Sequence, residues 1–354
     1  MFSISEILSL FGYSLILLSV VFFVLSFYWV PIFKFFNLKK YNNIQRVHLN
    51  EIPRFGGFVI YFFLCGLFFF NYIKEPFVSN LLISSAPFIF VSFKEDLFHN
   101  TSPKLRLISM LISCLIFFYI NPIEFPVIDI PFVGDLIAFY PVGIIFFTFS
   151  IMVVMNGMNL IDGMNGLFSF TALFQLFTIG FLAYNYKDTE MLYIVQIFSI
   201  PLLLFLFFNF PFGKIFAGDL GAYFFGFVNG LLIIYFFGIH PNLLTLLAVL
   251  ILFYPCAELL FSYYRKLKNK LSPFHPDNKH LHTLINKRIY KKLKNKTFAN
   301  SLSTLSLLLF WLLPFLIIIN IHQNTFLIFF CLIIFSYIYI YLYKLIDKRL
   351  RKTL

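Results

Sequence analysis

The stretch PLLLFLFFNF PFGKIFAGDL GAYFFGFVNG LLIIYFFGIH, residues 201–240, consists of two apolar runs with a short polar break between them. Its only charged residues, Lys214 and Asp219, lie in the break or next to it. A membrane-spanning helix needs about 20 largely apolar residues. The stretch therefore predicts the end of one spanning helix, 190–208, and the whole of another, 215–237, joined by a short loop.

The same pattern repeats along the chain of 354 residues, of which 60% are hydrophobic and 12% charged. A soluble domain carries about 25% charged residues and could not bury so much apolar surface. The sequence predicts an all-α, polytopic integral membrane protein with a single membrane domain over residues 1–354. The predicted spans are 7–31, 55–73, 77–93, 105–121, 137–155, 166–184, 190–208, 215–237, 242–262, 300–320 and 325–343.

The basic residues are distributed unevenly among the predicted loops. Of the 27 Lys and Arg, all but Lys74 and Lys187 fall in loops on one side of the predicted bilayer. Cytoplasmic loops are enriched in Lys and Arg, so we expect the N-terminus outside and the C-terminus in the cytoplasm. The longest polar stretch is the loop 263–299. Because no soluble domain accompanies it, the net charge of +12 predicts contact with lipid headgroups and phosphorylated ligands, and no nucleic acid.

Two polar motifs precede the middle of the chain. The first is IPRFGG, residues 52–57, in which Arg54 can bind phosphate; anchoring of a positive charge at the cytoplasmic surface is the alternative. The second is the carboxylate pair Glu95 and Asp96 at a helix end, followed by Lys104. Adjacent carboxylates at a membrane surface are costly unless they bind a divalent cation or accept a proton. An ion pair with a neighbouring lysine such as Lys104 is the alternative.

A third motif, NGMNLIDGMNG over residues 156–166, places a polar side chain at every third position. Amides and a carboxylate in such a row suit a nucleoside or a metal-bound phosphate. A loop with only a structural role would not need four such side chains at the edge of the membrane. The four candidate ligand residues are Asn156, Asn159, Asp162 and Asn165.

Two further motifs lie later in the chain. Asp219 opens an apolar helix, with glycines around it and Lys214 nearby, which favours a Mg²⁺-phosphate site; a helix cap is the alternative. In the loop 263–299, His280 and His282 stand two residues apart. Their spacing matches no usual zinc pattern, so we expect hydrogen bonds to sugar or phosphate.

Together these five motifs resemble those of the polyprenyl-phosphate N-acetylhexosamine-1-phosphate transferases, the WecA/MraY type of glycosyl transferase family 4. The resemblance runs from about Arg46 to His282, and the IPRFGG and His-x-His motifs are similar to the WecA-like branch. Three positions depart from the family pattern: Glu95 replaces the first Asp of a pair, Asn165 replaces an Asp, and Thr283 replaces a further His.

The resemblance implies transfer of N-acetylhexosamine 1-phosphate from a UDP-sugar to a polyprenyl (undecaprenyl) phosphate, with release of UMP. This would be the first membrane step of cell-surface glycan or O-antigen synthesis, at the cytoplasmic face of a bacterial inner membrane. Mg²⁺ is the implied cofactor, with Mn²⁺ as an alternative, and a homodimer is implied as well. One-step and two-step routes are both compatible with the sequence.

The resemblance also assigns roles. It makes Asp96, Glu95 and Asp219 the catalytic residues, and Asp219 and Asp162 the metal ligands. The implied substrate-binding residues are Arg54, Asn156, Asn159, Asp162, Asn165, Lys104, Lys214, His280 and His282.

Two other functions are open to a chain of this kind. A transporter or flippase of lipid-linked sugar would place polar residues near the bilayer midplane, in two related halves. Here the motifs gather at one surface, and no matching halves are evident. An inactive homologue with a scaffold role is the second alternative, for which Glu95 and Asn165 are the only indications.

Overall fold

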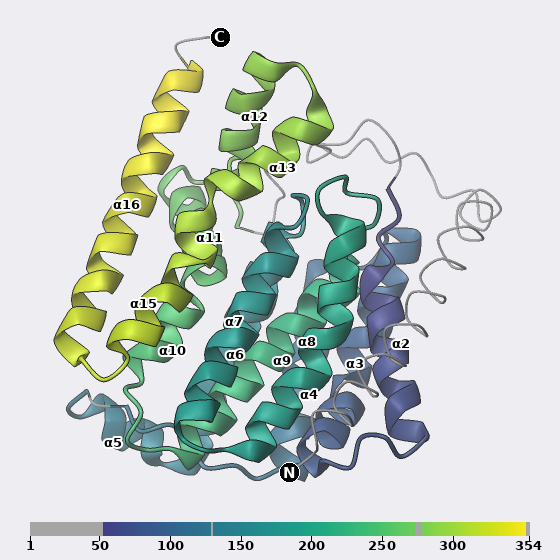
Figure 1. Ribbon diagram of the computed structural model, residues 1–354, viewed down its shortest axis with the longest axis vertical. Helices are drawn as coiled ribbons and strands as arrows, with labels where there is room; N and C mark the ends of the chain where they lie inside the picture. The colour runs from purple at the N-terminus through teal and green to yellow at the C-terminus, as the bar shows by residue number, and fades with distance from the viewer. Residues whose placement is uncertain (1–51, 129, 274–277, 352–354) are drawn as a thin grey trace.

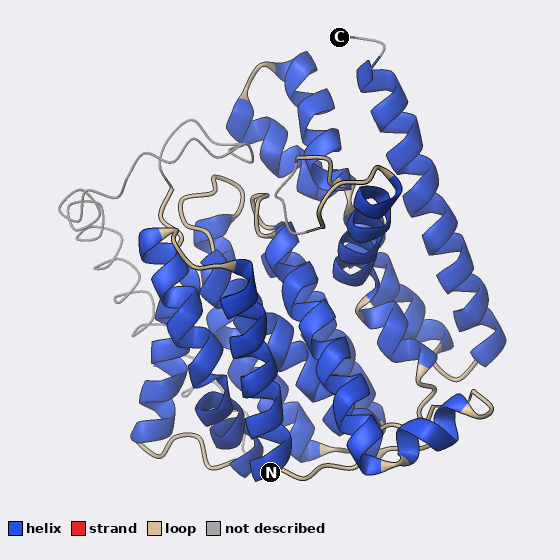
Figure 2. Cartoon of the chain, turned by 180° about the vertical axis from the view of Figure 1, so that it is seen from behind, coloured by secondary structure: helices blue, strands red, loops and turns tan. Residues whose placement is uncertain are grey.

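The computed structural model describes residues 52–128, 130–273 and 278–351, and every regular element within these ranges is an α-helix (Figures 1 and 2). In chain order the helices are α2 (Gly56–Phe69), α3 (Pro76–Phe98), α4 (Pro103–Ile120), α5 (Val133–Ala138), α6 (Tyr140–Ile161), α7 (Leu167–Asn185), α8 (Thr189–Asn209), α9 (Gly218–Ile239), α10 (Leu246–Ile251), α11 (Phe253–Lys268), α12 (Leu281–Leu293), α13 (Lys296–Ser306), α14 (Leu308–Trp311), α15 (Leu313–Ile321) and α16 (Thr325–Arg351).

The all-α, polytopic fold predicted from the sequence is confirmed. Among the described residues, seven helices are long and apolar enough to cross a membrane, and a pair of segments bent by 45°, Lys296–Ser306 and Leu308–Ile321, would make an eighth. Helix α2 is apolar but has only 14 residues. The predicted span 7–31 lies outside the described residues, so the count of eleven spans stays a prediction.

Two predicted spans are wrong as single helices. The structure divides the span 300–320 among α13, α14 and α15. It divides the span 242–262 into α10 and α11, with a break at Leu252. Pro255 has no N–H to donate to the carbonyl of Ile251, so the helical hydrogen-bond ladder cannot run through this point unbroken. The loop 263–299 is also more ordered than predicted, since α11 extends to Lys268 and α12 lies within the loop.

Helix α9 occupies the centre of the bundle, and α2, α3, α6 and α7 pack around it. Nearly all of its residues are buried. Small residues allow the neighbouring helices to approach closely, as is common within membranes. A Cβ added at Gly226 would lie 2.5 Å from the Cα of Met155 on α6, and one added at Gly57 on α2 would overlap the backbone of Gly221.

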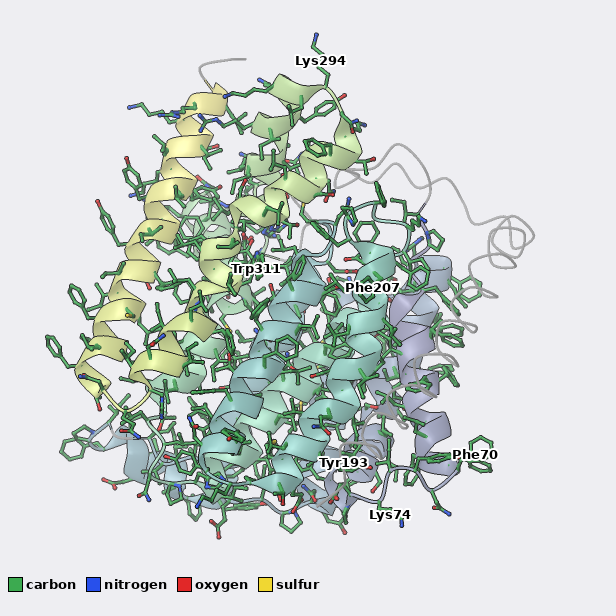
Figure 3. The ribbon with its side chains drawn as sticks, in the orientation of Figure 1. Phe70, Lys74, Tyr193, Phe207, Lys294 and Trp311 are labelled. Carbon is green, nitrogen blue, oxygen red and sulfur yellow. The ribbon has the colours of Figure 1, made fainter. Side chains whose placement is uncertain are left out.

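The sequence motifs all lie at one end of the bundle. Figure 1 shows that the start of α2, the end of α3, the end of α6 and the start of α9 share the end at which α16 terminates. In Figure 3, Lys294 lies at this end and Lys74 at the opposite end. The positions of these two lysines agree with the sorting of basic residues by predicted loop. The folding of the chain brings motifs that are more than 100 residues apart to the same end of the bundle.

The close approach at Gly226 gives a test of the packing. We expect Gly226→Ala to lower the free energy of unfolding by about 1–3 kcal/mol, because the methyl group would overlap the α6 backbone. Gly66→Ala on α2 is the matched control, since a Cβ added there meets nothing within 4 Å. Thermal unfolding of the detergent-purified variants measures the difference, and equal melting temperatures would contradict the packing.

Candidate active site

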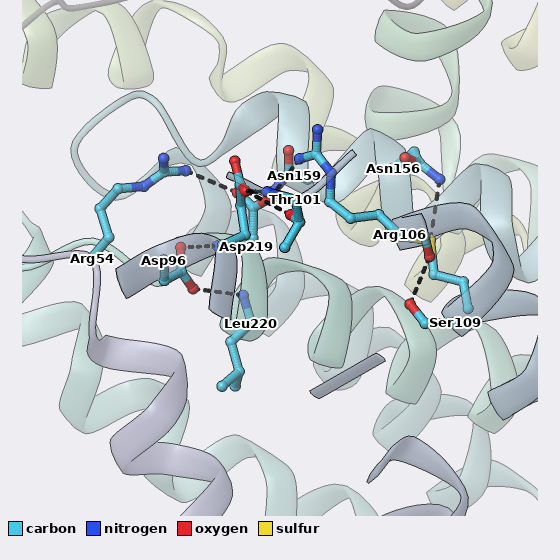
Figure 4. A network of polar contacts seen from close by, with 11 residues as sticks. Arg54, Asp96, Thr101, Arg106, Ser109, Asn156, Asn159, Asp219 and Leu220 are labelled. Carbon is cyan, nitrogen blue, oxygen red and sulfur yellow. Dashed lines mark hydrogen bonds and ion pairs between the residues drawn. The ribbon is translucent and has the colours of Figure 1, made fainter. Parts of the chain in front are cut away.

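Asp219, at the start of α9, is the centre of a buried polar cluster (Figure 4). Its Oδ1 accepts hydrogen bonds from Nη2 of Arg54 at 3.1 Å and from Nδ2 of Asn159 at 3.0 Å. Its Oδ2 accepts one from Nη1 of Arg106 at 2.8 Å. Two guanidinium groups therefore contact this one carboxylate, while Asp96 and Asp162 add further negative charge close to Arg54.

Two other carboxylates cap the start of α9. Asp96 accepts hydrogen bonds from the backbone N–H groups of Asp219 (2.8 Å) and Leu220 (3.0 Å). Asp162 accepts from those of Gly218 (2.9 Å) and Ala217 (3.3 Å). The first N–H groups of a helix have no partner within it. In α9 all four are satisfied by carboxylates from α3 and from the end of α6, which fixes Asp219 between them.

Gly218 allows this arrangement. Its φ is +75°, a conformation that favours glycine. A Cβ added there would lie 2.6 Å from Oδ2 of Asp96 and 2.6 Å from the carbonyl oxygen of Arg54. Gly218, the first glycine of the FAGDLG motif at residues 216–221, is therefore needed for the carboxylate of Asp96 to reach the start of α9.

Arg54 is positioned by backbone pairing between the IPRFGG motif and the segment before α9. The N–H of Phe216 donates to the carbonyl of Pro53, and the N–H groups of Gly56 and Gly57 donate to the carbonyls of Phe216 and Ala217, each at 2.9 Å. Motifs at residues 52–57 and 216–221 thus form one structural unit, which explains why an arginine from the start of α2 reaches Asp219.

Burial changes the acidity of the capping carboxylate at the end of α6. It raises the pKa of Asp162 to about 7, although Arg54 and the N–H groups of Gly218 and Ala217 act to lower it. A group with a raised pKa in a site that also holds Asp219 gains stability in its charged form when a cation binds nearby.

The donor atoms around Asp219 fit a magnesium ion. Mg²⁺ prefers oxygen ligands and is usually held by one or two carboxylates together with substrate phosphates and water. Asp219 and Asp162 offer such oxygens. In the part of the chain that the structure describes, no three His, Cys, Asp or Glu side chains are grouped as a complete protein-only metal site.

Several predicted site residues form no hydrogen bond to Asp219. Glu95 accepts hydrogen bonds from the N–H and the hydroxyl of Thr101, at 2.8 and 2.6 Å, and so closes the turn between α3 and α4. Asn156 donates to the carbonyl of Met152 in its own helix. Lys104 and Lys214 are exposed. Neither lysine forms an ion pair with a described residue.

Asn165 requires a correction, because the structure does not support the predicted substrate contact. Its residue exposure is 0%. Its Nδ2 donates to the backbone carbonyl of Pro211 at 2.8 Å and to Oγ of Ser301 at 3.0 Å. The hydroxyl of Thr304 donates to the backbone carbonyl of Asn165. Asn165 therefore ties the loop before α7 to α13. A carboxylate in its place could not donate to Pro211, which accounts for an amide at this position.

His280 and His282 are buried and meet a residue that the sequence reasoning missed. Nδ1 of each ring lies 3.3 Å from a different oxygen of Glu258 on α11. The sequence also did not predict Arg106 as a site residue. Both residues carried a signal, because a charged side chain inside an apolar helical segment is costly and usually functional.

Comparison with known proteins agrees with this geometry. Residues 78–237, which contain Asp96, Asp162 and Asp219, match glycosyl transferase family 4. The chain is 30% identical over 230 residues to a phospho-N-acetylmuramoyl-pentapeptide-transferase of Streptococcus agalactiae, covering 58% of this chain and 68% of the relative.

Two other relatives carry a different name. The undecaprenyl-phosphate alpha-N-acetylglucosaminyl 1-phosphate transferase of Salmonella typhi is 23% identical over 248 residues, 69% of this chain and 67% of the relative. A probable undecaprenyl-phosphate N-acetylglucosaminyl 1-phosphate transferase of Bacillus subtilis is 24% identical over 246 residues, 67% and 66% of the two chains. With its apolar helices and its buried Asp219 cluster, the chain is a membrane-embedded transferase and belongs to glycosyl transferase family 4.

Proposed function

We propose that the protein transfers an N-acetylhexosamine 1-phosphate from a UDP-sugar to undecaprenyl phosphate and releases UMP. The observation that carries the proposal is the carboxylate of Asp219, held between Arg54 and Arg106 at the start of the most buried helix. The names of the relatives from Salmonella typhi and Bacillus subtilis support this donor and acceptor. The IPRFGG and His-x-His motifs resemble the WecA-like branch and favour an N-acetylhexosamine that carries no pentapeptide.

The reaction joins two anions at the membrane surface. An oxygen of the lipid phosphate forms a bond to the β-phosphorus of the UDP-sugar. The bond from that phosphorus to the bridging oxygen breaks, and UMP leaves with the electron pair. Repulsion between the phosphates is the main obstacle, and fixed positive groups reduce it. Arg54 and Arg106 are well suited to this role, because guanidinium groups bind phosphate oxygens in pairs.

We propose that Asp219 and Asp162 hold Mg²⁺ together with the pyrophosphate of the donor. Bound Mg²⁺ would neutralise part of the charge that the leaving UMP gains. The resemblance makes Asp96 a catalytic residue, and this role stays a prediction. Asp96 accepts from the backbone N–H groups of Asp219 and Leu220, and we propose that it positions Asp219 for the metal and the substrate.

We also propose that the site faces the cytoplasm, with the C-terminus on the same side. The basic loops support this orientation, and UDP-sugars are found in the cytosol. The apolar helices below the site offer the acceptor's polyprenyl chain a place in the bilayer while its phosphate stays at the surface. A transporter would need its charged ligand-binding groups near the midplane, whereas the charged residues of this cluster lie at one end of the bundle (Figure 1).

Loss of the central carboxylate tests the proposal. We expect Asp219→Asn, and separately Arg106→Gln, to reduce transfer about 100-fold or more. The first change removes a proposed ligand of the metal, and the second removes a positive charge that would face the phosphates. UMP release and labelled lipid product, measured with purified protein, undecaprenyl phosphate and UDP-N-acetylglucosamine, give the rates. Lys74→Gln, at the opposite end of the bundle, is the control and should keep the wild-type rate. Near-normal transfer by Asp219→Asn would refute the assignment.

Metal dependence is tested by removing the ion. Treatment with a chelator should abolish UMP release, and added Mg²⁺ should restore it, since the residues that the structure describes supply only part of a ligand set. Full activity in excess chelator would contradict the proposed metal role of Asp219 and Asp162.

For Glu95 we predict an effect on stability and none on catalysis. If this residue had weakened a site built for Asp, Glu95→Asp would raise activity. We expect no gain, and a loss of about 1–3 kcal/mol in the free energy of unfolding, because the shorter side chain gives up its hydrogen bonds to Thr101. Thr101→Val, which removes the hydroxyl partner, should destabilise in the same direction. A large gain in transfer by Glu95→Asp would show that Glu95 belongs to the reacting centre.

A further inference from the structure

A second buried polar cluster is formed by residues of α11 and of the start of α12. Glu258 has an exposure of only 1%. Its Oε2 lies 3.3 Å from Nδ1 of His280, and its Oε1 lies 3.3 Å from Nδ1 of His282. The two imidazole rings stack with their centroids 5.4 Å apart and an angle of 5° between their planes. The carboxylate of Glu258 thus contacts both rings, in each case through the Nδ1 atom.

The packing of α11 on α6 brings this cluster toward the same end of the bundle as the Asp219 cluster. A Cβ added at Gly157 on α6 would overlap the carbonyl of Pro255 on α11, so the two helices are in direct contact there. Both helices run toward the same end of the bundle (Figure 1). Glu258 lies about one turn beyond Pro255, and Asn159, which donates to Asp219, lies two residues beyond Gly157.

The contact with Glu258 determines whether Nε2 of His282 donates or accepts a hydrogen bond. An ionised carboxylate only accepts hydrogen bonds, so Nδ1 must carry the proton. Burial lowers the pKa of His282 below its usual value, although Glu258 acts to raise it. In the neutral ring with a protonated Nδ1, Nε2 carries a lone pair and can only accept. Among the described residues, His282 hydrogen-bonds through Nδ1 alone.

We infer that Glu258 is a positioning residue that holds His282 with Nε2 as an acceptor for a hydroxyl or N–H group of the nucleotide sugar. The inference rests on the proposed function and names the part of the donor substrate that His282 contacts. A phosphate oxygen is excluded as its partner, because two acceptors facing each other repel. The phosphates are left to Arg54 and Arg106, and His282 contributes to the recognition of the sugar or the uridine.

Two substitutions of His282 distinguish a role as a hydrogen-bond acceptor from a role as a cation. His282→Gln keeps an acceptor oxygen near the position of Nε2, whereas His282→Lys supplies only donors and a charge. We expect His282→Lys to raise the KM for UDP-N-acetylglucosamine about 10-fold, while His282→Gln stays closer to wild type. A lower KM for His282→Lys than for His282→Gln would show a phosphate contact and overturn the inference.

Inhibition by UMP locates the donor group. If the partner is a hydroxyl or N–H of the uridine, His282→Lys should weaken inhibition by UMP as much as it raises the KM. If the partner is a hydroxyl or the acetamido N–H of the sugar, inhibition by UMP should stay unchanged. Either result agrees with an acceptor role once the lysine and glutamine variants differ as expected.

Glu258→Gln tests the positioning role. Its amide can accept from one imidazole but must donate to the other, so the tautomers are no longer fixed together. We expect the KM to rise about 10-fold with kcat largely kept. In the His282→Gln background the same change should add little, because the two residues act through one contact. Equal effects of Glu258→Gln in both backgrounds would overturn the inference.

Tyr254→Phe is the matched control for Glu258. Its hydroxyl donates to Oε1 of Glu258 at 3.2 Å and, among the described residues, forms no hydrogen bond with His282, so its loss should leave the KM near the wild-type value. Thermal unfolding of each variant separates a folding defect from a binding defect. If the wild-type protein released no UMP, the proposed function would fail, and calorimetric binding of UDP-N-acetylglucosamine to the same variants would still decide the role of Glu258.

Discussion

The start of α9 brings four backbone N–H groups and the carboxylate of Asp219 into a buried position at one end of the bundle. Polar groups buried at the edge of a membrane must find partners, since water is scarce there. Asp96 and Asp162 supply them for the backbone, and two arginines supply them for Asp219. Each partner comes from a different part of the chain, so the helices that carry them must meet at this point. The packing of α3 and α6 on α9, and of α4 on α3 and α6, meets this requirement.

The same constraint gives the cluster its reactivity. Asp219 is saturated by Arg54, Arg106 and Asn159 in the described structure, and all three groups can turn to phosphate oxygens or to a metal-bound pyrophosphate. Two guanidinium groups that can bind phosphate oxygens suit a reaction in which two anions approach each other. A preorganised site of this kind needs little rearrangement of the backbone, because the helix start is fixed by its caps.

The sequence predicted most of this cluster, but it could not separate ligands from structural residues within a motif. Asn159 and Asp162 meet Asp219 or its helix, whereas Asn165 faces α13 from the same loop. The spacing of three residues predicts a common face only as long as a helix continues, and α6 ends at Ile161. Likewise Glu95 precedes Asp96 directly, yet successive residues of a helix point in different directions.

The sequence by itself determined the helical membrane fold and the end of the bundle at which the chemistry lies. Apolar length and the sorting of Lys and Arg are local properties that can be counted along the chain. Only the tertiary structure decided that Arg106 reaches Asp219 and that Glu258 holds His280 and His282. These contacts join residues from separate helices, and the distance between two helices depends on side-chain packing, which no local pattern records.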